Sequence, residues 1–119
     1  MNNKLQSVDF THLNTITGED VNFRNELIGI FLEQIPDFIG NMKKFLAGNE
    51  LQNLAREAHT AKSSVLIFGM TNTGHLLKDI QLWAENKKTM EIEPALKQVE
   101  MDLNQARIDL MKVLKESQL

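Results

Sequence analysis

Apolar residues recur every three or four positions along most of this chain, the spacing that places them on one face of an α-helix. The longest such stretch predicts a helix from about Asp20 to Ala47, and Pro36 lies inside it. Because proline cannot donate the backbone hydrogen bond and its ring crowds the preceding turn, we expect a kink or a local break there. The apolar positions of this helix are Leu27, Phe31, Ile35, Phe38, Met42, Phe45 and Leu46.

The same spacing predicts four further helices. A short leading helix covers residues 8–16, and another helix begins at Asn49 or Glu50 and ends near Gly69. Thr71 is the expected N-cap of the next helix, because its side-chain oxygen can accept a hydrogen bond from a free backbone N–H. After a polar loop, the last helix is expected over residues 94–117, with Pro94 in its first turn.

Four substantial amphipathic helices with short links predict an all-α fold, an antiparallel four-helix bundle with a short extra N-terminal helix. The 119 residues suit one domain, residues 1–119. The chain has two prolines, six glycines and no tyrosine, which favours helices over a β fold. The near-heptad spacing in the last helix has two explanations, a row of core residues within the bundle or a separate coiled-coil dimer. Bundles commonly pack in this way, so the first is favoured and we expect a monomer.

Composition excludes several classes of function. The absence of cysteine rules out disulfides, zinc–thiolate sites and iron–sulfur clusters. A formal net charge of −3 argues against nucleic acid and anionic membranes as partners. We expect a cytoplasmic protein, because neither a membrane span nor a signal peptide is evident. Without a glycine-rich phosphate loop, no kinase or ATPase activity of its own and no cofactor are expected.

One histidine, His59, stands in a pattern that suits phosphoryl chemistry. If the apolar stripe of its helix faces the core, His59 lies about 100° round from the buried Ala58, at the edge of that stripe. The small residues Ala55 and Ser63 then leave room for another protein, and Lys62 places a cation near the ring. A neutral imidazole keeps a lone pair for attack. On these features alone, a boundary histidine without a chemical role is the commoner explanation.

The residues around His59 also carry a family resemblance. Residues 58–64 read Ala-His-Thr-Ala-Lys-Ser-Ser, and Phe-Gly-Met follows at residues 68–70. This segment resembles the histidine-containing phosphotransfer (HPt) family, whose hallmark is Ala-His-x-Leu-Lys-Gly-Ser followed by a glycine near the helix end. Residues 31–37 and 46–49 resemble the family's preceding helix and its stop. Leu76, Ile80 and Gln81 fall where the family has its leucine-rich fourth helix, so the resemblance covers about residues 20–86.

The resemblance implies a role for each matching residue. His59 is implied as the phosphoryl acceptor, on Nε2, and Lys62 as the cation that stabilises the phosphoryl charge. Gln81 is implied to hold the imidazole by a hydrogen bond, with a plain solvated glutamine as the alternative. Residues expected to contact a partner are Arg56, Ala55, Ser63 and Ser64, although Arg56 also fits an ordinary exposed helix arginine.

Three positions depart from the family pattern. Ser63 replaces the usual glycine; it is still small, so access to the histidine should persist, and its hydroxyl could bond a phosphate oxygen. Ala61 and Thr73 replace common leucines, which we expect to alter packing and to leave the chemistry intact.

The function that the resemblance implies is a phosphorelay intermediate of two-component signalling. A receiver-domain aspartate would supply the phosphoryl group to His59, and a second receiver would take it; a hybrid sensor histidine kinase is a further expected partner. One alternative is a bundle that binds receivers or kinases without phosphotransfer. A metal-binding bundle would need Glu-x-x-His pairs, but the positions three before His59, His75 and His12 hold no glutamate, so no metal is expected.

Overall fold

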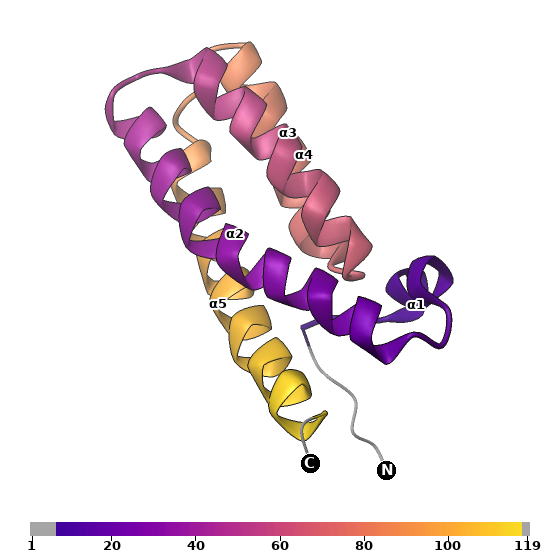
Figure 1. Cartoon of the computed structure of the whole chain (residues 1–119). Coiled ribbons are helices and arrows are strands. Elements are labelled where there is room, and N and C mark those ends of the chain that lie inside the picture. Colours follow the sequence, from indigo (N-terminus) through magenta and orange to yellow (C-terminus); the bar gives the residue numbers. More distant parts are fainter. Residues whose placement is uncertain (1–6, 118–119) are drawn as a thin grey trace.

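Five α-helices make up the computed structural model, which describes residues 7–117 (Figure 1). Their bounds are α1 Thr11–Thr17, α2 Val21–Ala47, α3 Leu51–Ile67, α4 Thr71–Glu85 and α5 Ile92–Glu116. No strand occurs within the described residues, so the predicted all-α class is confirmed. None of these helices is both long and apolar enough to cross a membrane.

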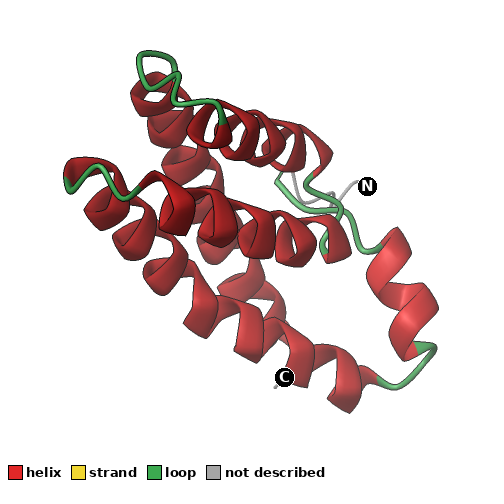
Figure 2. Ribbon diagram, turned by 90° about the horizontal axis from the view of Figure 1, so that it is seen from above, coloured by secondary structure: helices red, strands yellow, loops and turns green. Residues whose placement is uncertain are grey.

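The four longer helices close into a bundle. The most extensive contact is between α3 and α4; α2 packs on α3 and on α5, and α5 packs on α4. Each helix therefore touches two neighbours, in the order α2, α3, α4, α5 round the bundle. The short α1 stands to one side and packs on α2, as the view from above shows (Figure 2). This arrangement confirms the predicted bundle with a short extra N-terminal helix.

The core contains the apolar positions that the sequence pattern places on one face of each helix. Phe31 of α2 is fully buried and stacks on Phe68, with ring centroids 4.4 Å apart and planes 10° from parallel. Burial of one such side chain stabilises the fold by about 1.5–3 kcal/mol. On α3, the buried positions include Leu54, Ala58, Ala61 and Val65, so the predicted core face of this helix is correct.

Some details of the predicted helices differ in the structure. Of the kink or local break expected at Pro36, the break does not occur, because α2 continues from Val21 to Ala47. The proline is exposed while Ile35 and Phe38 are buried, so packing on the opposite face holds the helix together across it. Thr71 is the first helical residue of α4, and Met70 occupies the N-cap position without a side-chain bond.

A short N-terminal segment ties the turn between α3 and α4 to α5. The Asp9 backbone N–H donates to the Phe68 carbonyl at 2.9 Å, and the Ser7 hydroxyl donates to the carboxylate of Asp109. The Asp9 carboxylate also accepts from the Thr11 N–H at 2.8 Å, so α1 starts at Thr11 and not at residue 8. Through these bonds the N-terminal segment connects the turn between α3 and α4 with α5.

Gly69 makes this close approach possible. Its φ is +70°, and a Cβ atom built there would lie 2.5 Å from the Asp9 carbonyl oxygen. A side chain at this position would therefore meet both the left-handed backbone penalty and a steric overlap with backbone.

We predict that Gly69→Ala lowers the free energy of unfolding by at least about 1–2 kcal/mol, the cost of a left-handed non-glycine residue, with the overlap adding to that loss. Gly40→Ala is the matched control: it lies inside α2, and a Cβ there meets no atom within 4 Å. That control should raise stability by about 0.5–1 kcal/mol. Urea unfolding measures both, and equal effects of the two substitutions would contradict the assigned role of Gly69.

Candidate functional site

His59 lies midway along α3, with its side chain exposed at the edge of the interface with α4. The preceding residue, Ala58, is fully buried, so the helix turns the imidazole from the core to the surface within one step. Across the interface, the Nδ1 atom of His59 lies 3.3 Å from Oε1 of Gln81 on α4. The structure thus brings together two site residues that are 22 positions apart in the sequence.

Glu85 extends this contact by one more residue. The Nε2 atom of Gln81 donates to Oε2 of Glu85 at 3.1 Å, one turn further along α4. The result is a row of three polar side chains: imidazole, amide and carboxylate. Among residues 7–117, the second ring nitrogen of His59, Nε2, takes part in no hydrogen bond, which leaves that side of the ring for an incoming group.

An open hollow of about 530 Å³ lies beside the imidazole, between α3 and α4. Arg56 and His59 line it from α3, Gln81 and Glu85 from α4, and Lys87 from the connection that follows. The hollow thus combines two cationic side chains with one carboxylate next to the exposed ring.

Lys62 and Ser63 follow His59 by one helical turn. Lys62 is half-buried, and neither of the two ion pairs within residues 7–117 involves it, so its ammonium group is not neutralised by a protein carboxylate. The Ser63 hydroxyl donates to the backbone carbonyl of His59 at 3.3 Å. This hydroxyl is therefore engaged with its own helix and does not bond the ring.

The other residues expected to contact a partner occupy different surroundings. Arg56 is exposed. Ala55 is only 6% exposed and forms part of the wall of the hollow, so its contact with a partner stays a prediction. Ser64 is half-buried and donates to Oε1 of Gln34 at 3.2 Å, which joins α3 to α2 away from the imidazole.

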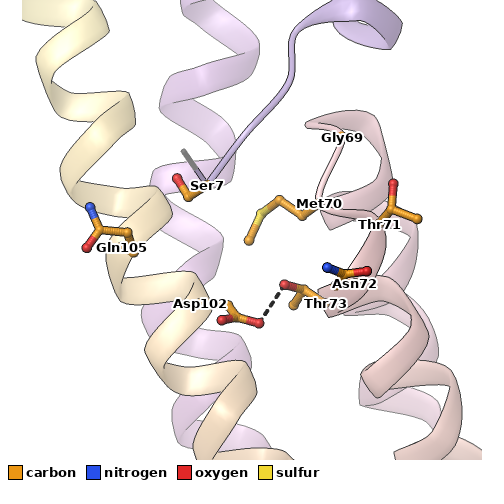
Figure 3. A pocket seen from close by; sticks show the side chains of 8 residues that line it. All are labelled: Ser7, Gly69, Met70, Thr71, Asn72, Thr73, Asp102 and Gln105. Carbon is orange, nitrogen blue, oxygen red and sulfur yellow. Dashed lines mark hydrogen bonds between the residues drawn. The ribbon is translucent and has the colours of Figure 1, made fainter. Parts of the chain in front are cut away.

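A second hollow, of about 390 Å³, lies at the turn between α3 and α4 and does not include His59. Figure 3 shows Thr73 of α4 directed at Asp102 of α5, and the hydroxyl donates to the carboxylate at 2.8 Å. Thr73 is 4% exposed and Ala61 is fully buried, so both positions where the family has leucine are core positions here. Thr73 replaces an apolar contact by a polar link between helices.

The remaining histidines take no part in this site. His12 is exposed on α1 and His75 is exposed on α4. Within the described chain, no group of three His, Asp or Glu side chains is placed to hold a metal ion.

Glu85 is the functional-site residue that the sequence did not single out. It lies four residues after Gln81, the separation at which side chains on a helix are neighbours, so this spacing was the available signal.

Comparison with known proteins identifies the family of this chain. The model of the Hpt domain family matches residues 26–111. The crystal structure of histidine-containing phosphotransfer protein B (HptB) from Pseudomonas aeruginosa PAO1 is similar, with a TM-score of 0.86, 15% identity, and coverage of 95% of this chain and 98% of that chain.

The crystal structure of the HPT domain from the Hpt sensor hybrid histidine kinase from Shewanella gives a TM-score of 0.79 and 18% identity, with 98% of each chain covered. No curated protein was found to match the sequence. These two likenesses support the fold, and the family model covers well over half of the chain. The chain therefore belongs to the Hpt domain family.

Proposed function

We propose that this chain is a phosphorelay intermediate, in which His59 accepts a phosphoryl group from a receiver-domain aspartate and passes it to another receiver. Membership of the Hpt domain family supports a role in two-component phosphotransfer. The observation that carries the proposal is the imidazole itself: it is exposed, and its Nδ1 is engaged with Gln81 while Nε2 faces no protein partner in residues 7–117. A nucleophile for another protein's phosphoryl group needs this combination of fixed orientation and open access.

The transfer step follows from this geometry. The Nε2 lone pair attacks the phosphorus of the donor aspartyl phosphate, and the phosphorus–oxygen bond to the donor carboxyl group breaks. The leaving oxygen keeps the bonding electron pair, so the donor becomes a free carboxylate. The ring, still protonated on Nδ1, carries a positive charge, and Oε1 of Gln81 accepts the Nδ1 hydrogen bond that stabilises it. In the second transfer a carboxylate of the next receiver attacks the phosphorus, and the electron pair of the nitrogen–phosphorus bond returns to Nε2.

Lys62 is the protein's counter-charge for the phosphoryl oxygens. It lies one turn after His59 and forms no ion pair with another described residue. A cation already present near the reacting centre stabilises the charge that builds up on the transferred group without being reorganised during the reaction. Its contribution is moderated by solvent, because the side chain is only half-buried.

The first prediction concerns the acceptor. On incubation with a phosphorylated receiver domain, wild-type protein should acquire an acid-labile, alkali-stable phosphoryl label, because phosphohistidine has that stability. His59→Gln should remain unlabelled, while His75→Gln, altered at an exposed histidine of the adjacent helix, should be labelled like the wild type. Equal label on wild type and His59→Gln would refute the relay. Absence of label on every form would favour a binding module without phosphotransfer.

The second prediction concerns the counter-charge. Lys62→Ala should slow formation of phosphohistidine by about tenfold, since one electrostatic donor in a solvent-accessible site is removed. The thermal unfolding midpoint should change little. Lys112→Ala, an exposed lysine on the distant α5, is the control and should leave the rate unchanged. If Lys62→Ala instead lowers thermal stability strongly while phosphohistidine forms at the normal rate, Lys62 is a structural residue.

A further inference from the structure

Glu85 is the end of the polar row that begins at His59 and passes through Gln81. We infer that Glu85 is a positioning residue: by fixing which end of the Gln81 amide faces His59, it keeps the proton of the neutral ring on Nδ1 and the lone pair on Nε2. This inference rests on the proposed function for its consequence, because Nε2 is the proposed nucleophile. The hydrogen-bond argument itself depends only on the three side chains.

The amide of Gln81 has two ends of similar shape, an oxygen that only accepts hydrogen bonds and an NH2 group that only donates them. Rotation of the amide by 180° exchanges the two ends at almost no steric cost, so its own shape does not select an orientation. The neighbours of the amide must make the selection. One neighbour is His59, whose Nδ1 can either donate or accept, so this ring does not by itself fix the orientation of the amide.

The other neighbour, Glu85, is not neutral. An ionised carboxylate only accepts, so the end of Gln81 that faces it must be the NH2 group, as found in the 3.1 Å contact from Nε2 of Gln81 to Oε2 of Glu85. The oxygen of Gln81 then faces His59 at 3.3 Å. Since that oxygen can only accept, Nδ1 must carry the hydrogen, and a neutral imidazole has no second hydrogen for Nε2.

The cations of the same hollow leave this assignment in place. Arg56 and Lys87 also line the hollow, but the two ion pairs within the described chain lie elsewhere, at Lys43–Glu100 and Lys97–Glu93. The carboxylate of Glu85 is thus available to the amide. A carboxylate that orients a histidine through one hydrogen bond is the logic of the serine-protease triad; here an amide is interposed between the two.

Loss of Glu85 should therefore act on the tautomer of His59 and not on the fold. In Glu85→Gln the new amide can face Gln81 with either end, so the orientation is no longer selected. In Glu85→Lys the new side chain only donates, so it favours the reversed amide, in which the NH2 group of Gln81 faces His59. Nδ1 would then have to accept, and the hydrogen would move to Nε2, which removes the lone pair from the reactive position.

The test is nitrogen NMR of the His59 ring in 15N-labelled, unphosphorylated full-length chain at about pH 8, above the usual histidine pKa. Wild type should show a protonated Nδ1 and an unprotonated Nε2. The ratio of the Nδ1–H to the Nε2–H form should fall about two- to tenfold in Glu85→Gln, in keeping with one hydrogen bond, and should fall further in Glu85→Lys. Asp79→Asn is the control; it removes the same charge from an exposed position on α4 and should leave the ratio unchanged.

A wild-type ring protonated mainly on Nε2, or a ratio unaltered by both Glu85 substitutions, would overturn the inference. An equal fall in Asp79→Asn would also overturn it, because the effect would then come from charge in general. No partner protein is present in this measurement, so its outcome is separate from that of the phosphotransfer assay. If the ratio responds as expected while wild type is never phosphorylated, the positioning role of Glu85 stands and the proposed relay fails.

Discussion

Close packing of α3 on α4 is the interaction on which the rest of the site depends. Small residues make it possible: Ala58 and Ala61 of α3 are fully buried, and Gly74 is buried in α4. A Cβ atom on Gly74 would lie 2.7 Å from Cδ2 of Leu66, so the side chain of Leu66 packs directly on the backbone of α4 at this point. Because close-packed interiors resist displacement, this contact sets the register that carries Gln81 to His59. The exposed imidazole of His59 is thus oriented by the same interface that stabilises the bundle.

Side-chain hydrogen bonds between neighbouring helices support that register. Asn41 and Gln34 of α2 bond to Glu57 and Ser64 of α3, at 3.1 and 3.2 Å, and the hydroxyl of Thr73 joins α4 to Asp102 of α5. Each link needs two specific side chains at matching heights, so a one-turn slip of a helix would leave them unpaired. Packing between apolar helix faces alone would tolerate a one-turn displacement of a helix more readily. The row that ends at Glu85 uses the same kind of hydrogen bond, with the difference that its first member, His59, is exposed.

The fold could be predicted from the sequence because a spacing of three and four residues dictates both the helices and their buried faces. At Pro36 the sequence left open a kink or a break. The helix is not broken there, because the cost of one proline is local while the packing on the opposite face of α2 is not visible in the sequence. Helical spacing placed His59 at the edge of the core, but it could not show that Ala55 is buried in the wall of the hollow. The contact of Gln81 with His59 was predicted only from the family resemblance, because the two residues lie on different helices. Glu85 escaped notice for a related reason: its spacing from Gln81 is informative only once that glutamine is known to face the histidine.

The most direct test of the central claim is the position of the phosphorus on the protein after reaction with a phosphorylated receiver domain. Nitrogen–phosphorus coupling in 15N-labelled protein identifies the bonded atom. With Nδ1 held by Gln81 at 3.3 Å and Nε2 open, the phosphorus should be bonded to Nε2 of His59. Phosphorus on Nδ1 of that ring, or on His12 or His75, would contradict the role assigned to the imidazole, amide and carboxylate between α3 and α4.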